Sequence, residues 1–290
     1  MDKYNKNLNR GYKMKSKLIF GVLALGLSIG LLCTQGQAKE LSVDEIVRKA
    51  NHMALYQGAD SKGKVLLVIK DKQGRIRKRE FNMLRKNDDT NDRDQKYYAF
   101  FKSPADVRKM VFLVHKHAEL EKDDDRWLYM PSLDLVKRIA AGDKRTSFVG
   151  SDFLYEDISG RSPEEDKHEL INTTEKHYVV NNVPKDRDSV EFDHYIAYIN
   201  RENYIPEKIE FVKKGNRLYR VIEVVKVDNI TANEDGKEVV YPTVTLSIAR
   251  DLESGSISEM NVSKVKYNIG LGDKLFTERY LRRPPRDAMR

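Results

Sequence analysis

Residues 126–157 read RWLYMPSLDLVKRIAAGDKRTSFVGSDFLYED, and the fold prediction starts from this stretch. The sequence predicts a short apolar strand at 127–130, which Pro131 ends because proline cannot donate a hydrogen bond to a sheet ladder. A second short strand is predicted at 135–140, before a turn at 141–143. The second half of the stretch sets aromatic side chains beside acidic ones and contains no catalytic arrangement. This pattern is typical of an aromatic surface beside a mobile, amphipathic loop, which suits ligand binding better than catalysis.

Residues 1–38 have the composition of a cleavable export signal. Three lysines precede an apolar run at 18–32, and Gly36 and Ala38 supply the small residues that a signal peptidase reads. Cleavage is therefore predicted between Ala38 and Lys39, which places the mature chain in the periplasm. The apolar run is about 15 residues long, shorter than the roughly 20 that cross a bilayer, and an uncleaved anchor is the alternative.

The charge balance of the mature chain argues against nucleic-acid binding. The whole chain carries 53 basic and 45 acidic residues, of which the leader holds six and one, so the mature chain keeps 47 and 44 and a net charge of +3. Nucleic-acid binding would need a concentrated basic face. Cys33 is the single cysteine and is removed with the leader, so disulfides, thiolate metal sites and cysteine nucleophiles are excluded together. The sequence predicts no cofactor.

One amphipathic helix is predicted directly after the leader. Ser42 and Glu45 form a capping-box pattern, apolar residues recur at helical spacing, and Gly58 ends the element. This helix is expected to cover one open side of a sheet, or to act as a lid that touches a ligand. From Lys62 onward the apolar period changes to two, which is typical of strands. The predicted strands cover 65–69, 80–85, 97–102, 110–117, 127–130, 135–140, 176–180, 190–200, 208–213, 217–228, 239–250 and 262–269.

These segments predict a mainly β protein: a half-open, curled antiparallel β-barrel of about 10–11 strands with an N-terminal helix and short lid segments. A doubly wound fold is excluded because no strands alternate with long helices. Residues 39–290 are expected to form one domain, since no linker rich in Pro, Gly or Ser divides them. Pro242 marks its strand as an edge strand or a bulged one.

Several predicted strands carry apolar residues on both faces, notably 66–69, 97–101, 111–114 and 127–130. A sheet with one solvated face should alternate cleanly between apolar and polar residues. Two apolar faces indicate that both are covered or that one lines an apolar cavity. If a helix and a loop cover the inner face only in part, a hydrophobic slot is left, and eight strands already suffice to enclose one small ligand.

Three sequence blocks, RWLYMP, VKRIAAGDKR and FVGSDFLYED, resemble the LolA-like outer-membrane lipoprotein-sorting proteins. FFKSPADVRKMVFL at 100–113 and LFTERYLRR at 275–283 are similar to flanking blocks of the same branch. Residues 108–110 depart from it, since Arg-Lys-Met stands where the family has a glycine and a small polar residue. The resemblance implies a half-open barrel with a helical lid, and a periplasmic carrier that binds acyl chains of lipids or lipoproteins. It also implies an association with lipid exporters of the resistance-nodulation-division type in the inner membrane.

The expected function is thus transport of an acylated lipid or lipoprotein toward the outer membrane, with transient membrane contact and no catalysis. A non-carrier periplasmic partner of an exporter is the alternative. The candidate lipid-binding residues are Trp127, Tyr129, Phe148, Phe153 and Tyr155, and the candidate lid hinge is Gly150 with Ser151. Aromatic residues that simply complete the core are the alternative for each of the five.

Other signals support no chemistry of their own. His115 and His117 share one face of a strand, but no third metal ligand is evident, so no metal site is predicted. The acidic residues Asp152, Glu156 and Asp157 are expected to form salt bridges to Lys144 and Arg145, or to solvate the loop, rather than to act as acid and base. The arginine-rich end of the chain is expected to be a solvated tail, with contact to anionic headgroups as the alternative.

Overall fold

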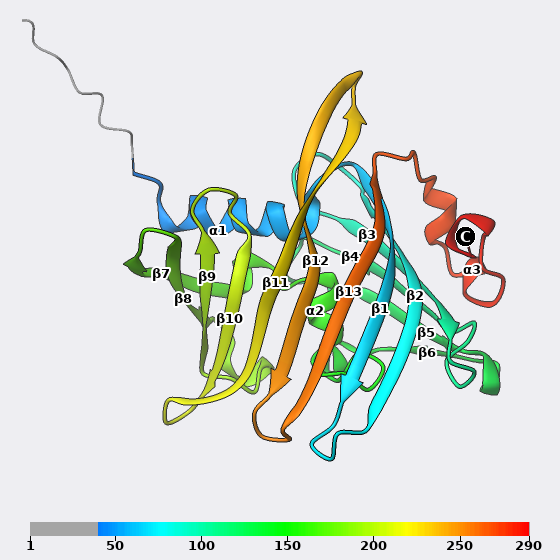
Figure 1. Ribbon diagram of the computed structural model, residues 1–290, viewed down its shortest axis with the longest axis horizontal. Coiled ribbons are helices and arrows are strands. Elements are labelled where there is room, and N and C mark those ends of the chain that lie inside the picture. The colour runs from blue at the N-terminus through cyan, green and yellow to red at the C-terminus, as the bar shows by residue number, and fades with distance from the viewer. Residues whose placement is uncertain (1–39, 290) are drawn as a thin grey trace, which may run out of the picture. The chain divides into compact units, whose positions relative to one another are not determined.

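The computed structural model describes residues 40–289, in which a single antiparallel sheet of 13 strands dominates (Figure 1). The predicted leader at 1–38 and the Ala38–Lys39 cleavage site lie outside the described residues. The strands are β1 Asp60–Lys70, β2 Ile76–Asn87, β3 Gln95–Ser103, β4 Val111–Lys116, β5 Asp125–Met130, β6 Leu135–Arg138, β7 Asp166–Thr173, β8 His177–Pro184, β9 His194–Asn200, β10 Pro206–Lys213, β11 Arg217–Glu234, β12 Lys237–Asp251 and β13 Ser256–Tyr267.

The helical elements are short and lie at the ends of the chain or between strands. They are α1 Val43–Asn51, η1 His52–Tyr56, η2 Pro131–Leu133, η3 Ala141–Asp143, α2 Tyr155–Ser159, η4 Pro163–Glu165, η5 Arg187–Ser189, η6 Asp273–Phe276, α3 Arg279–Arg282 and α4 Arg286–Met289. In the described part of the chain, none of these helices has the length and apolar character needed to cross a membrane.

The order of the strands shows where the sheet is open. It runs β6-β5-β4-β3-β2-β1-β13-β12-β11-β10-β9-β8-β7, so the first and last strands of the sequence pair at its centre. The two edges, β6 and β7, are consecutive in the sequence. The chain between them, residues 139–165, must therefore pass from one edge of the sheet to the other, and it is called the central segment below. We call the face of the sheet that this segment and α1 cover the inner face.

The predicted fold class is confirmed, and each of the twelve predicted ranges overlaps a strand, so the thirteen strands exceed the expected total of about ten or eleven. The strand missing from the prediction is β7, whose sequence DKHELINT is mostly exposed. An edge strand with little apolar surface carries no clear period of two, so its sequence gives no strand signal. Pro242 behaves as predicted. It lies where β12 pairs with β11 but not with β13, because β12–β13 pairing begins only at Leu246.

The N-terminal helix α1 forms as the sequence predicts and covers the β7 end of the sheet. The Ser42 hydroxyl accepts a hydrogen bond from the Glu45 amide (3.3 Å), and the Glu45 carboxylate accepts one from the Ser42 amide (2.8 Å). Buried Ile46 and Ala50 pack on β8 and β9. The prediction that this helix covers an open side of the sheet is confirmed.

The end of the chain is not a solvated tail. Residues 271–289, called the C-terminal cover here, pack on the outer face of β2 to β5 and bury Phe276, Leu281 and Ala288. Beneath them lie Tyr98 and Leu113, while their sequence neighbours Tyr97, Ala99 and Phe112 point to the inner face. These strands are apolar on both faces because each face has its own cover, which is one of the two explanations that the sequence left open.

The central segment fills the inner face over β1 to β4. Phe148 is fully buried there and lies 5.5–6.0 Å, centroid to centroid, from four aromatic rings. These rings belong to Phe81, Phe101, Phe112 and Tyr155. Such tilted and edge-to-face contacts are the favourable arrangements of aromatic pairs. This half of the inner face is therefore a packed core.

Candidate functional site

A cavity of about 470 Å³ lies on the inner face between this packed core and α1. Its walls come from three directions: α1 with η1, the inner face of β1, β2 and β10 to β13, and one side of the central segment. The apolar lining residues include Val47, Ala50, Met53, Ala54, Leu55, Val65, Met83, Phe153, Ile158, Ile205, Ile209, Phe211, Ile222, Val224, Val244, Met260, Val262 and Val265. The volume is in the range of about 300–1,000 Å³ that is usual for small-molecule sites.

The hollow exists because no segment within residues 40–289 lies on the middle of the inner face. The central segment packs on β1 to β4, and α1 packs on β8 and β9. Between them the side chains of Ile222, Met260 and Val262 are only partly buried. The residues that α1 and η1 turn toward them include Ala50 and Ala54, whose side chains are too small to fill the gap.

One end of the cavity is polar. Gln57, Ser61, Arg85, Thr243 and Tyr267 line it, and they come from the end of η1 and from β1, β2, β12 and β13. The Thr243 and Tyr267 hydroxyls are 3.0 Å apart, and the Tyr267 ring stacks on the Tyr241 ring at a centroid distance of 4.5 Å. We call this set of five residues the polar end. These side-chain contacts bridge β12 and β13 beyond the point where their backbone pairing stops.

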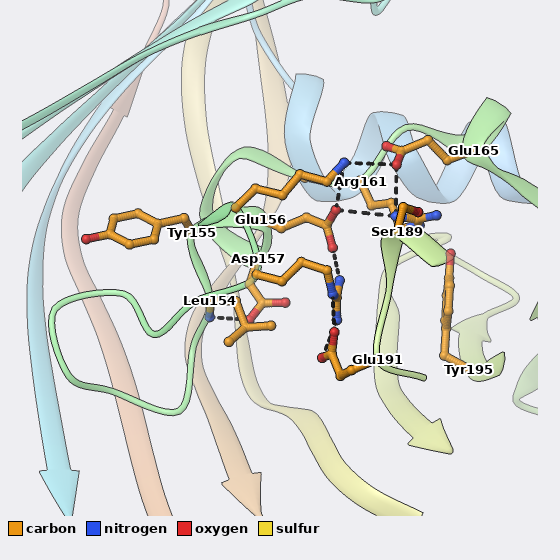
Figure 2. A network of polar contacts seen from close by, with 12 residues as sticks. Leu154, Tyr155, Glu156, Asp157, Arg161, Glu165, Ser189, Glu191 and Tyr195 are labelled. Carbon is orange, nitrogen blue, oxygen red and sulfur yellow. Dashed lines mark hydrogen bonds and ion pairs between the residues drawn. The ribbon is translucent and has the colours of Figure 1, made fainter. Parts of the chain in front are cut away.

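A buried ionic network fastens the central segment to the β7 end of the sheet (Figure 2). Glu156 is 5% exposed and forms ion pairs with Lys144 (3.4 Å), Arg145 and Arg161 (3.4 Å). The predicted salt bridges from Lys144 and Arg145 are thereby confirmed for Glu156. Arg161 also contacts Asp166 of β7 (2.8 Å).

The network continues to the segment before β9. Arg145 contacts Glu191 (2.6 Å). Burial would raise the pKa of Glu191, but the hydrogen bond and charge of Arg145 outweigh it and hold that pKa at about 2. The Tyr195 hydroxyl donates to Asp166 (2.8 Å). Glu156, which could have served as an acid or a base, is thus committed to ion pairs that hold the loop in place.

The other two acidic residues of the loop bind different partners. Asp157 pairs with Arg220, and the Asp152 carboxylate accepts a hydrogen bond from the Ser258 hydroxyl (2.6 Å). Arg220 also donates to the Asp152 carbonyl oxygen (3.2 Å). These contacts tie the loop to β11 and β13.

The structure distributes the five candidate lipid-binding residues over three environments. Phe153 lines the cavity. Phe148 and Tyr155 lie in the packed core, and burial raises the pKa of the Tyr155 hydroxyl. Trp127 and Tyr129 lie on the outer face, in contact with the C-terminal cover. The Arg282 guanidinium lies 5.7 Å from the centre of the Tyr129 ring. The cavity therefore brings only Phe153 of the five into its lining.

The candidate hinge is a tight turn with its own hydrogen bonds. Val149 and Gly150 both have positive φ (+46° and +79°), a conformation that glycine adopts readily and valine rarely. The Ser151 hydroxyl donates to the Phe148 carbonyl oxygen (2.8 Å), and the Phe148 amide donates to the Phe153 carbonyl oxygen (2.7 Å). Motion about Gly150 and Ser151 would break these bonds, and the hinge stays a prediction.

The sequence interpretation missed the residues of the polar end. A signal for Arg85 was present, because alternate residues of a strand share a face, so within the predicted strand 80–85 Arg85 lies on the same face as the apolar Phe81 and Met83. No comparable signal existed for Thr243 or Tyr267, since they meet only through the pairing of distant strands.

The two histidines considered as metal ligands, His115 and His117, are each engaged with other parts of the protein. His115 Nε2 lies 2.6 Å from the Phe276 carbonyl oxygen, and His117 lies beside Asp94 and Asp125. Over residues 40–289, no three His, Cys, Asp or Glu side chains are grouped so that they could hold a metal ion.

Comparisons with known proteins agree with this architecture. A family model described as "uncharacterized protein" matches residues 93–283, more than half of the chain. No curated protein matches the sequence significantly. Among solved structures, a DUF1329 family protein from Desulfovibrio piger is 25% identical, with a TM-score of 0.71 over 82% of this chain and 98% of that one.

Two further structures share the fold. A putative outer membrane lipoprotein-sorting protein domain from Vibrio parahaemolyticus is 24% identical, with a TM-score of 0.67 over 82% of this chain and 97% of that one. A LolA superfamily protein from Nitrosomonas europaea is 21% identical, with a TM-score of 0.60 over 83% and 100%. The fold of this chain, an open antiparallel sheet with an N-terminal helix, is thus shared with these three structures. The chain belongs to the family whose model matches residues 93–283, and the DUF1329 family protein from Desulfovibrio piger is similar to it over nearly its whole length.

Proposed function

We propose that this protein is a periplasmic carrier that binds an acyl chain of a lipid or lipoprotein in the inner-face cavity and moves it toward the outer membrane. The observation that carries the proposal is the apolar cavity of about 470 Å³, left open on a sheet whose remaining inner face is packed. Exposing an acyl chain of roughly 15 methylenes to water costs about 12 kcal/mol, at ~0.8 kcal/mol each. A cavity with an apolar lining offsets that cost during transfer.

The proposal assigns no catalytic step, because the acidic residues of the central segment are engaged in ion pairs and hydrogen bonds. It includes export by the predicted leader, with cleavage between Ala38 and Lys39. It also includes a donor in the inner membrane, such as a lipid exporter, and transient contact with a membrane. Cargo release requires that the cavity walls separate, and the wall formed by α1 and η1 is the one that we expect to move.

The test places a large side chain in the cavity. Ser247 lies on the inner face of β12 and lines the cavity, so Ser247→Phe should block it. The matched control is Ser263→Phe, the same substitution at an exposed position of β13. Binding of the fluorescent fatty acid cis-parinaric acid to the mature protein is then measured by titration.

We expect Ser247→Phe to lower affinity at least about tenfold, equivalent to about 1.4 kcal/mol, and Ser263→Phe to leave it unchanged. The proposal fails if the wild-type protein does not bind the probe or if Ser247→Phe binds it as tightly as the wild type. A wild-type protein that binds no acyl probe but captures an exporter from inner membranes would instead indicate the non-carrier partner.

A further inference from the structure

The charged residue of the polar end, Arg85, is buried, and within residues 40–289 its side chain forms no ion pair. Its side chain is 8% exposed and forms part of the cavity lining. It donates to the Ser61 hydroxyl (3.3 Å), to the Asn87 side-chain oxygen (2.6 Å) and to the Gln57 carbonyl oxygen. A longer contact reaches the Gly58 carbonyl oxygen (3.3 Å). Within residues 40–289, all of these acceptors are uncharged.

The charged residues that the central segment contributes to the cavity lining are, by contrast, all engaged in ion pairs. Arg161 is paired with Asp166 and Glu165, Asp157 with Arg220, and Glu156 with several cations. Taking an ion out of water costs several kcal/mol unless an opposite charge compensates it, and a guanidinium cannot avoid the cost by losing its proton. Burial lowers the pKa of Arg85, with desolvation outweighing the attraction of Tyr97, Tyr267 and Asp60.

The neighbours of Arg85 add hydrogen-bonding groups on the same wall. Ser61 is the cross-strand partner of both Arg85 on β2 and Tyr267 on β13, so the three side chains form a row across the inner face. The Tyr267 hydroxyl continues the row to Thr243 (3.0 Å). A guanidinium flanked by hydroxyls at one end of an apolar cavity matches an amphiphile whose polar group is an anion.

We propose that Arg85, with Ser61 and Tyr267, receives the carboxylate or phosphate group of the amphiphile whose acyl chain occupies the cavity. The inference rests on the proposed carrier function and adds the charge of the ligand. The bound anion supplies the counter-ion that Arg85 does not have among residues 40–289, so occupied protein contains a complete ion pair. Ligands that are equally apolar but uncharged leave Arg85 unpaired.

The test compares ligands that share a chain and differ in charge. Hexadecyl phosphate and hexadecanol form one pair, and palmitate and methyl palmitate form the other. Each competes with the neutral fluorescent probe N-phenylnaphthylamine on the mature protein. The two pairs distinguish a phosphate from a carboxylate as the preferred group. The variants are Arg85→Gln and Arg85→Lys, and Lys64→Gln is the control because it removes one positive charge from the opposite face, where Lys64 pairs with Asn82.

We expect the wild type and Lys64→Gln to prefer at least one anion over its neutral analogue by about tenfold or more, as for a charge-assisted hydrogen bond in a dry site. Arg85→Gln should reduce that preference to about one while binding the neutral ligands as before, and Arg85→Lys should keep part of it.

Three outcomes overturn the inference. If the wild type binds anions and neutral analogues equally, the polar end is no headgroup site, although the carrier function stands. If Arg85→Gln weakens both ligands by the same factor, Arg85 only holds the end of η1 through its bonds to Gln57 and Gly58. If the wild type binds none of the ligands, the carrier function fails as well. The wild-type preference decides the matter even if Arg85→Gln does not fold.

Discussion

The two halves of the inner face are covered differently: one half is packed core, and the other borders a cavity. Over β1 to β4 the face is covered by the aromatic side chains of the central segment, and Phe148 contacts four rings there. Over β10 to β13 the cover within residues 40–289 is more open, since α1 and η1 present small residues such as Ala50 and Ala54 and the central segment reaches this half only along one side. The covering segments therefore help to decide whether a part of the sheet face becomes core or cavity.

Substitutions in the two halves should therefore have different effects, on folding stability in one half and on ligand binding in the other. A packed core resists substitution because each side chain fills space that nothing else can fill. A wall of an existing cavity has already lost part of those contacts, so changes there should cost little folding energy and affect binding instead. The predictions below test that separation.

The largest effect is expected from truncating a ring in the packed half. Phe148→Ala should reduce the free energy of unfolding by about 3–5 kcal/mol, because it opens a void among four rings. Ile222→Ala, in the cavity wall, should cost about 1 kcal/mol, since its side chain already faces open space. Denaturant unfolding followed by circular dichroism measures both. Equal losses would contradict the division of the inner face into two halves.

A smaller effect is expected from adding volume instead of removing it. Ala99 is fully buried in the packed half, so Ala99→Phe should overpack it and cost about 1–3 kcal/mol. Ser247→Phe should change stability by less than about 0.5 kcal/mol, because the ring enters the cavity. Thermal melting of the two variants without ligand makes the comparison. A stability loss in Ser247→Phe as large as in Ala99→Phe would mean that the cavity is not open to a side chain.

A third effect is confined to a range of pH. Lys116 of β4 is buried, and its amine donates to the carbonyl oxygens of Ser159 (2.9 Å) and Gly160 (3.1 Å) in the central segment. Desolvation lowers the pKa of Lys116 from 10.5 to about 8, although Asp124, Glu165 and Glu156 oppose the shift. The unfolded chain therefore holds this proton more tightly than the folded protein does.

The free energy of unfolding of the wild type should consequently rise, relative to that of Lys116→Met, as the pH increases from about 8 to 10.5. Below about pH 8 the difference between the two proteins should be constant, because Lys116 is charged in both states. Melting temperatures of both proteins across this range give the difference directly, and effects of the buried tyrosines cancel between them. A difference that does not change with pH would show that Lys116 keeps an ordinary pKa.

The sequence allowed the architecture to be predicted where the signal is local. Ser42 and Glu45 fix the start of α1 within four residues of each other, and the period of two between 65 and 250 marks most strands. The polar strand β7 has no such period. The C-terminal cover was interpreted as a solvated tail because arginines are interspersed among its buried residues, which include Phe276, Leu281 and Ala288.

The site was harder to predict because burial depends on distant partners. Nothing near Phe148 or Tyr155 in the sequence tells whether an aromatic ring enters a core or a cavity, and both rings pack against strands far away in the chain. Of the five candidate lipid-binding residues, only Phe153 lines the cavity, and it lies at the border between the two halves. Arg85 could have been noticed, since a charged residue on the apolar face of a strand requires an explanation.

The most direct test of the carrier account is the mass of the protein as it is isolated. The mature chain is purified from the periplasm without detergent, and native mass spectrometry is combined with extraction and identification of lipids. We predict a population carrying a single acyl lipid in the wild type and in Ser263→Phe, and none in Ser247→Phe. A wild-type protein that shows only its bare mass, with no more extractable lipid than Ser247→Phe, would contradict the claim that the hollow half of the inner face holds an acyl chain.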